Sequence, residues 1–146
     1  MDRRLQIAMD AADPRGLGRF WCEALGYVEE PPPAPYPDWP AALSGWGLPE
    51  ERWNDAYVIV DPERVGPRIF IQKVPEGKSA KNRVHLDVGV PGHQSRDEPA
   101  SPGEVRANVE RLVDAGARVI QEYDQGPMGF WVVMADPEGN EFCACA

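Results

Sequence analysis

The residues best placed to do chemistry are a histidine and a glutamate in the second half of the chain. His85 lies in a predicted strand, Val84 to Val90, in which it alternates with apolar residues, and Glu141 begins a predicted strand that ends at Cys145. Because residues two apart share a face of a strand, His85 and Glu141 are expected on the polar faces of their strands, where they converge. Such a pair suits a divalent metal site, or a general base beside a polarising group.

The elements that would position this pair occur twice in the chain. The phrase Asp-Pro-Glu appears at residues 61–63 and again at 136–138, each time after an apolar run and before a last strand-like run. Each half also begins with a strand and a helix, and the helix starts are marked by Asp13-Pro14 and by Ser101-Pro102-Gly103-Glu104. The sequence therefore predicts an internal duplication, with the order strand, helix and about three strands in each half. Gln6 takes the place in the first half that His85 takes in the second.

Composition restricts the partners of the protein. With 146 residues, 42% of them hydrophobic, the chain can bury one sizeable core, whereas each half alone would be marginal. The net charge of -9 argues against nucleic acid, whose phosphates require a basic surface. The apolar run near the start is too short for a membrane span or a signal core. We therefore expect a cytoplasmic protein with reduced cysteines, and a small molecule or a second copy as its partner.

Aromatic residues form a second group of candidates. Of the five tryptophans, Trp21 is expected in the core, because it lies on the apolar face of the first helix. The others are predicted in loops or near strand starts, where they would line an aromatic pocket or a dimer interface: Trp39, Trp46, Trp53 and Trp131. The proline-rich segment 31–40 is predicted to be an extended loop, acting either as a rigid connection or dimer arm or as a ligand lid.

Several motifs together resemble one known family. They are Lys81-Asn82-Arg83-Val84-His85-Leu86-Asp87-Val88, the run from Met134 to Cys143, Arg19-Phe20-Trp21 and Ala24-Leu25-Gly26-Tyr27. The chain resembles the vicinal oxygen chelate (VOC) superfamily over nearly its whole length, and most of all its glyoxalase-like branch. The resemblance implies an α+β fold, in which two βαβββ modules form a cupped, incomplete mixed β-barrel. It implies one domain over residues 1–146, with module 1 at about 1–78 and module 2 at about 79–146, in a homodimer.

The resemblance also implies a set of site residues. In metal-using members, each module supplies one ligand from its first strand and one from its last, which here gives His85 and Glu141 from the second module and Gln6 from the first. The last strand of the first module places Phe70 and Gln72 on one face and lacks the expected glutamate. Gln72 is the nearest substitute, and neutral amides are poor ligands for a transition metal.

Three functions remain open. The first is binding of a small aromatic or apolar molecule, as in the bleomycin-resistance type, by Gln6, Phe70, Gln72 and the four non-core tryptophans. The second is a lyase, isomerase or dioxygenase that uses Ni, Zn, Fe or Mn on His85, Glu141 and Gln6. The third is a metal-free enzyme with His85 or Glu141 as the general base. His85 is also open to a purely structural interpretation, as an interior histidine bonded to Glu141 or Asp87.

Overall fold

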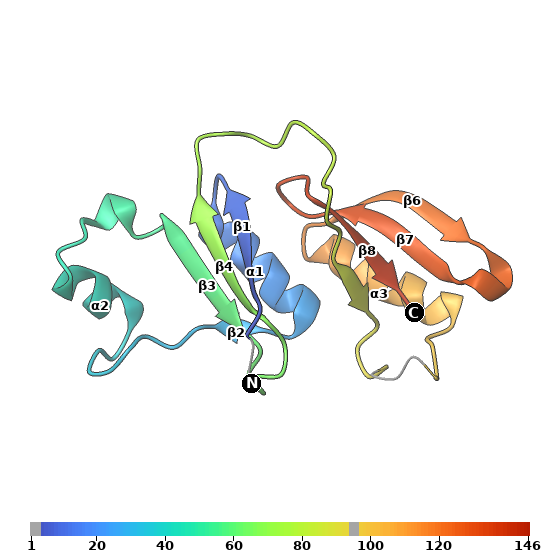
Figure 1. Ribbon diagram of the computed structural model, residues 1–146, viewed down its shortest axis with the longest axis horizontal. Coiled ribbons are helices and arrows are strands. Elements are labelled where there is room, and N and C mark those ends of the chain that lie inside the picture. The colour runs from blue at the N-terminus through green and yellow to red at the C-terminus, as the bar shows by residue number, and fades with distance from the viewer. Residues whose placement is uncertain (1–3, 94–96) are drawn as a thin grey trace. The chain divides into compact units, whose positions relative to one another are not determined.

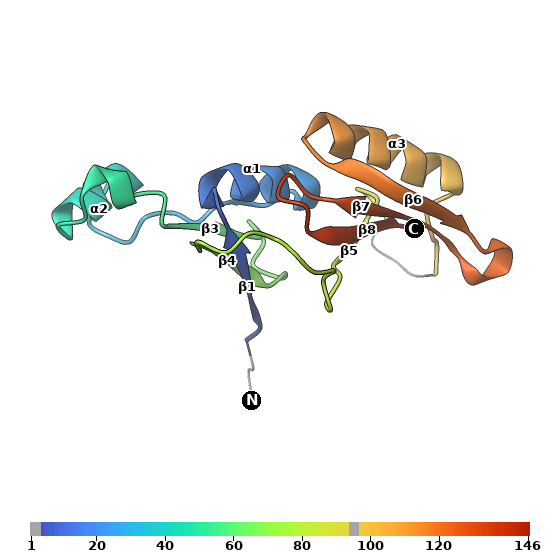
Figure 2. The same ribbon diagram turned by 90° about the horizontal axis from the view of Figure 1, so that it is seen from above.

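A computed structural model describes residues 4–93 and 97–146. The chain forms two compact units, Met1–Gly77 and Lys78–Ala146. Each unit has one four-stranded mixed sheet, and one long helix packs on one face of that sheet (Figures 1 and 2). Neither sheet is closed. The predicted α+β architecture with two βαβββ modules is therefore confirmed.

In the first unit, a long helix lies between the first two strands, and a short helix and a 3-10 turn precede the third strand. The elements are β1 (Gln6–Ala11), α1 (Pro14–Leu25), β2 (Val28–Glu29), α2 (Trp39–Gly45), the 3-10 turn η1 (Glu50–Arg52), β3 (Ala56–Val60) and β4 (Arg68–Lys73). The sheet order is β1-β4-β3-β2, with β1 and β4 parallel and the other pairs antiparallel. As predicted, Asp13 caps α1 by accepting a hydrogen bond from the Gly16 amide, and Gly26 ends the helix in the left-handed conformation.

The second unit repeats this order. Its elements are β5 (Asp87–Gly89), α3 (Pro102–Asp114), β6 (Arg118–Asp124), the 3-10 turn η2 (Gly126–Met128), β7 (Phe130–Ala135) and β8 (Glu141–Cys145). The sheet order is β5-β8-β7-β6, again with a parallel pair, β5 and β8. The predicted capping box is present, because the side chains of Ser101 and Glu104 each accept a hydrogen bond from the backbone of the other.

Each sheet buries the face that lies under its helix and leaves the other face open. In the first unit, α1 packs on β3 and β4, and the buried side chains are Leu17, Phe20, Trp21, Ile59, Ile69 and Ile71. In the second, α3 packs on β7 and β8, and they are Val105, Leu112, Val132, Met134 and Phe142. Burial alternates along β8, with Glu141, Cys143 and Cys145 less buried than their neighbours, as predicted. The polar residues of the site thus lie on the open faces.

The predicted strand from Val84 to Val90 is wrong over its first half. Only Asp87–Gly89 forms β5, and Val84 is 76% exposed rather than part of an apolar face. The Leu86 carbonyl still accepts a hydrogen bond from the Cys143 amide. Before that point, the backbone amide of Asn82 donates to the Glu141 side chain instead of to a neighbouring strand. The segment before β5 is thus held to β8 by a side-chain contact rather than by a strand ladder.

Two further predictions need correction, one about the proline-rich loop and one about the apolar face of a helix. The loop expected to run to Pro40 ends earlier, because Asp38 accepts a hydrogen bond from the Ala41 amide and caps α2, which begins at Trp39. In α3, the spacing of Val105, Val109, Leu112 and Val113 predicts that all four share the apolar face, but Val113 is exposed and Asn108 is buried instead. The Asn108 side chain is satisfied there, since its oxygen accepts hydrogen bonds from Arg111.

Close packing of α1 on β3 leads to a stability prediction. A Cβ atom at Gly18 would overlap the ring of Tyr57, whereas one at Gly103, in the first turn of α3, meets no closer atom than the Ser101 hydroxyl at 3.9 Å. Gly18→Ala is therefore expected to destabilise the protein by about 1 kcal/mol through overpacking. Gly103→Ala should be neutral or slightly stabilising, since alanine is the better helix former. Urea unfolding of both variants would check this, and an equal effect of the two would contradict it.

Candidate functional site

An aromatic cavity lies in the first unit. Its volume is about 280 Å³, and its walls come from α2, the turn after it, and strands β3 and β4. The apolar lining residues are Trp39, Leu43, Trp46, Leu48, Trp53, Ala56, Val58 and Phe70. Four of the predicted ligand-binding residues, Trp39, Trp46, Trp53 and Phe70, therefore surround one cavity.

The tryptophan rings are held in place by their neighbours. Trp39 and Trp46 meet edge to face with ring centres 6.2 Å apart, and Tyr36 packs in the same manner on Trp46 at 5.9 Å. The indole nitrogen of Trp39 donates to the Glu30 carbonyl at 2.6 Å, and that of Trp53 donates to the Leu48 carbonyl at 2.9 Å. These bonds satisfy the polar edge of each indole. Trp46 is 54% exposed.

Arg68 occupies the polar border of the cavity. Its guanidinium group binds both carboxylate oxygens of Glu30, at 2.8 and 2.7 Å, and donates to the Gln6 oxygen at 2.6 Å. The hydrogen bonds from Arg68 lower the pKa of Glu30, and those to Glu30 raise the pKa of Arg68. Arg68 also lies over the Phe70 ring, 5.9 Å from its centre. The charge of Arg68 is thus neutralised within the unit.

Gln6 and Gln72 lie on the open face of the same sheet, as predicted. In the register of β1 and β4, Gln6 is opposite Arg68, and Asp10 is opposite Gln72. The Gln6 oxygen accepts from Arg68, and the Gln72 amide nitrogen donates to an Asp10 carboxylate oxygen at 2.8 Å. Both amide side chains therefore already have polar partners.

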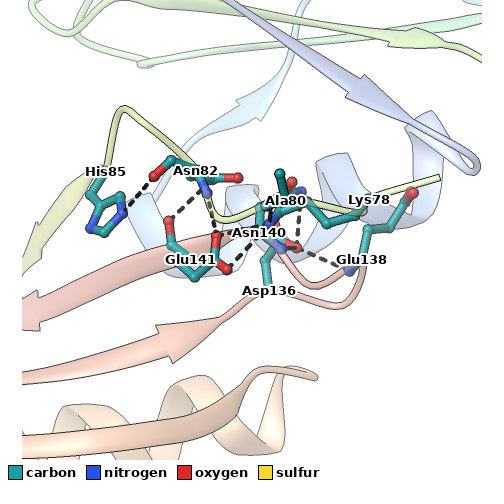
Figure 3. Close-up of polar contacts among 8 residues, drawn as sticks. All are labelled: Lys78, Ala80, Asn82, His85, Asp136, Glu138, Asn140 and Glu141. Atoms are coloured by element: carbon teal, nitrogen blue, oxygen red, sulfur yellow. Dashed lines mark hydrogen bonds and ion pairs between the residues drawn. The ribbon is translucent and has the colours of Figure 1, made fainter. Parts of the chain in front are cut away.

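Glu141 and His85 lie close together in the second unit and share one neighbour, Asn82 (Figure 3). The Asn82 amide donates to a Glu141 carboxylate oxygen at 2.9 Å, and the Lys78 ammonium group forms an ion pair with Glu141 at 3.0 Å. The Asn82 hydrogen bond and then Lys78 lower the pKa of Glu141 to about 2. Glu141 is therefore a permanent carboxylate at neutral pH and a weak base.

His85 is turned toward the backbone of Asn82. Its Nε2 lies 3.1 Å from the Asn82 carbonyl oxygen, so Nε2 must carry the proton and donate it. In the neutral ring, Nδ1 then remains as the acceptor. The predicted convergence of a histidine and a glutamate thus takes the form of two side chains on either side of Asn82.

The predicted metal ligands are engaged in other contacts. Glu141 binds the ammonium group of Lys78, the Nε2 of His85 faces a carbonyl group, and the Gln6 oxygen binds Arg68. Within either unit, no three described His, Cys, Asp or Glu side chains lie close enough to share a metal ion. A divalent cation would also have to compete with Lys78 for Glu141. As arranged in each unit, these residues do not fit a metal centre.

Trp131 belongs to the second unit and lies in strand β7. Its ring stacks on Tyr123 of the neighbouring strand β6, with ring centres 5.3 Å apart and an interplanar angle of 17°. On β8, the other neighbour of β7, burial raises the pKa of the Cys143 thiol to about 11. That thiol is therefore protonated at neutral pH and unsuited to nucleophilic chemistry.

Sequence reasoning missed several residues of these sites, among them Lys78, Asn82 and Arg15. Lys78 and Asn82 precede the predicted strand in a segment without periodicity, and each reaches Glu141 across about 60 residues of chain. Asn82 was part of the family motif, but no side-chain role was assigned to it. Arg15, at the start of α1, lines the aromatic cavity, and the helix-start signal beside it indicates nothing about its side chain.

Comparison with known proteins agrees with this fold. A sequence model described as the glyoxalase-like domain matches residues 6–145. The chain belongs to the glyoxalase-like domain family, of the VOC type. A search of curated proteins finds no match. None of the described helices is long and apolar enough to cross a membrane.

Solved structures show the same fold at low sequence identity. FosX, a fosfomycin resistance protein from Listeria monocytogenes, was solved as a point mutant with Mn(II) and dihydroxypropylphosphonic acid. Its structure matches this one with a TM-score of 0.62 and 14% sequence identity, over 100% of this chain and 91% of that chain. A glyoxalase/bleomycin resistance protein/dioxygenase family enzyme from Burkholderia phytofirmans has a TM-score of 0.60 and 15% identity, over 94% and 93%. A possible glyoxalase from Bacillus cereus has a TM-score of 0.60 and 13% identity, over the whole of both chains.

Proposed function

We propose that the protein binds a small planar, largely apolar molecule in the aromatic cavity of its first unit. The observation that carries this proposal is that Trp39, Trp46, Trp53 and Phe70 line one cavity of about 280 Å³. Ligand pockets are typically lined by aromatic and aliphatic side chains with a few polar groups, and this volume is at their lower limit. The ligand is accordingly small, of the size of two or three aromatic rings.

The tryptophans offer apolar ring surface, because the nitrogen atoms of Trp39 and Trp53 already donate to backbone carbonyls. Aromatic stacking in such a cavity adds about 0.5–1.5 kcal/mol per pair to the gain from burying apolar surface. The exposed position of Trp46 in the unliganded protein means that a ligand which covers this ring removes apolar surface from water. Binding of this kind needs neither a metal nor a reactive group.

A fluorescence titration tests this function. Phenylnaphthylamine, a neutral aromatic probe whose emission rises in apolar surroundings, is expected to bind with micromolar affinity. Trp46→Ala should weaken its binding about tenfold, because the variant loses one stacking partner and its buried area. Trp131→Ala is the matched control: it removes a half-buried tryptophan from the second unit and should leave the affinity unchanged.

Two results would contradict the proposal. One is the absence of micromolar binding for the probe and for every member of a library of aromatic natural products, measured by tryptophan quenching. The other is equal weakening by Trp46→Ala and Trp131→Ala, because the site would then lie elsewhere. Circular dichroism of each variant verifies that the fold is retained.

A second proposal places an enzymatic role at His85 and Glu141. The observation that favours it is that both side chains meet at Asn82 on the open side of the second unit. In a metal-free reaction, His85 is the better base of the two, because the pKa of Glu141 is only about 2. Turnover of a bound ligand that is lost in His85→Ala would support this role.

The metal-dependent form of that proposal has its own test. Protein purified without chelator would contain Ni, Zn, Fe or Mn in an equimolar amount, and His85→Ala would lose it. A protein that takes up no metal even after soaking would rule this form out.

A further inference from the structure

Arg15 stands out among the charged residues of the aromatic cavity. It is the second residue of α1, and its backbone amide donates to the Asn54 side-chain oxygen at 2.9 Å, which fixes the start of the helix against the segment before β3. Its side chain lines the cavity together with Trp53 and Tyr57. A cation is thus held beside the aromatic wall of the cavity.

The guanidinium group of Arg15 lacks a full set of partners. Its Nε is buried, and within the described part of the chain it has no hydrogen-bond partner. The carboxylate of Asp13, two residues earlier, is already engaged, because its Oδ1 accepts from the Asn54 side chain at 2.7 Å and from the Gly16 amide at 3.1 Å. A buried donor without an acceptor is unfavourable, and more so when it is charged. A ligand acceptor that reaches the guanidinium group as the Arg15 side chain turns toward the cavity would therefore be bound strongly.

The other arginines of the cavity do not share this property. Arg52 forms an ion pair with Asp55 at 2.8 Å, and Arg68 forms one with Glu30 at 2.7 Å. The remaining carboxylate of the lining, Glu29, is exposed to solvent and needs no partner from a ligand. Arg15 is accordingly the arginine of the lining that forms no ion pair in the described part of the chain, although its charge is felt by the carboxylate of Asp13.

We infer that the ligand of this cavity is a planar aromatic anion, whose carboxylate, sulfonate or phenolate oxygen accepts a hydrogen bond from Arg15 while its rings pack on the tryptophans. This inference rests on the proposed binding function and adds the chemical class of the ligand. The guanidinium group suits an oxyanion because its donors lie in one plane and match two acceptor oxygens. Arg15 acts here as a specificity residue, since the rings alone would bind neutral and anionic compounds alike.

Two fluorescent probes of nearly the same shape test separately whether the cavity binds aromatic molecules and whether it prefers anions. Anilinonaphthalene sulfonate and phenylnaphthylamine have the same aromatic skeleton, and only the first carries a negative group. The wild-type protein should bind the sulfonate more tightly than the neutral probe. Arg15→Gln should weaken binding of the sulfonate about tenfold to a hundredfold, the loss of a charge-assisted hydrogen bond, and leave the neutral probe within about twofold.

The chain offers matched controls on the same helix and in the same cavity. Arg19→Gln makes the same charge change one turn further along α1, at an exposed residue outside the aromatic cavity, and should affect neither probe by more than about twofold. Arg15→Lys keeps the charge and should restore part of the sulfonate affinity. Glu29→Gln removes a negative charge from the lining and should strengthen sulfonate binding only.

The outcomes distinguish the two proposals. If the neutral probe binds and Trp46→Ala weakens it, but Arg15→Gln leaves the ratio of the two affinities unchanged, the anionic class is wrong and the binding function stands. An equal change of that ratio in Arg19→Gln would also overturn the role of Arg15, because the effect would then be one of net charge. If neither probe nor any member of the aromatic library binds to the folded wild-type protein, the binding function itself fails.

Discussion

Asp136→Ala is expected to lower the free energy of unfolding by about 3 kcal/mol, whereas Asp61→Ala, in the first copy of the same turn, should lower it far less. Asp136 is 3% exposed. Its Oδ1 accepts hydrogen bonds from the Glu138 and Asn140 amides at 3.0 and 2.9 Å, and its Oδ2 accepts one from the Asn140 side chain at 2.9 Å (Figure 3). Without the carboxylate, these donors lose their acceptor away from water.

The two copies of the turn differ in burial rather than in bonding pattern. Asp61 also accepts three backbone hydrogen bonds, from Glu63, Val65 and Gly66, and these lower its pKa. Its turn lies at the surface, so water can replace the lost acceptor in Asp61→Ala. The position of Asp136 before β8 adds a functional consequence, because the turn it shapes leads directly into Glu141.

Urea unfolding followed by circular dichroism measures both variants under the same conditions. Equal losses for Asp136→Ala and Asp61→Ala would contradict the role of burial, and a loss below about 1 kcal/mol in Asp136→Ala would contradict the role of its hydrogen bonds. The duplication itself thus supplies the control, since both variants remove one carboxylate from the same type of turn.

Local signals predicted most of the fold. Asp13-Pro14 and the Ser101 capping box mark the helix starts, and the alternation along Glu141 to Cys145 marks the buried face of β8, because these patterns depend on neighbours a few residues away. The departures occur where a distant group intervenes. The first half of the predicted strand at Val84 does not form, and just before it the Asn82 amide bonds to the side chain of Glu141, which is 59 residues away.

The sequence predicted which residues belong to the candidate sites, but not which partners their side chains bind. Residue type and strand face placed Gln6, Phe70 and Gln72 together on one side of the first sheet, and the structure agrees. Their partners could not be foreseen. The Gln6 oxygen is bound by Arg68 and the Gln72 amide by Asp10, each 62 residues away, and Lys78 reaches Glu141 from a loop without any periodic pattern. Such contacts depend on sheet order, which no local pattern encodes.

Lys78→Met is the second substitution with a large expected effect, and it acts through Glu141. The variant should lower the free energy of unfolding at neutral pH by about 2 kcal/mol, because the partly buried carboxylate keeps the Asn82 hydrogen bond but loses its cation. The ion-pair side chains are 23% and 16% exposed, so solvent screens their interaction only in part. The pKa of Glu141 should rise from about 2 toward the ordinary value, but not reach it while the Asn82 bond persists.

The same variant changes the pH dependence of stability in a defined direction. The pKa of Glu141 is about 2 in the folded protein and about 4.3 in an unfolded chain, so its contribution to stability is present above about pH 5 and is lost as the pH falls toward 2. With a higher folded-state pKa, Lys78→Met should lose less of its own stability over that range, so the difference between the two proteins should shrink below about pH 4 and nearly vanish only at about pH 2.

Urea unfolding at a series of pH values between about 7 and about 2 measures this convergence. Lys81→Met provides the control, because it removes an exposed lysine from the same segment, and none of the described carboxylates forms an ion pair with it. Parallel pH curves for the wild type and Lys78→Met would mean that Lys78 does not set the pKa of Glu141. A curve for Lys81→Met that matches Lys78→Met would assign the effect to net charge. If the stability of Lys78→Met converges with that of the wild type at low pH and that of Lys81→Met does not, Lys78 is the cation that holds the charge of Glu141. The second unit would then supply its own cation to the carboxylate that the family resemblance marked as a metal ligand.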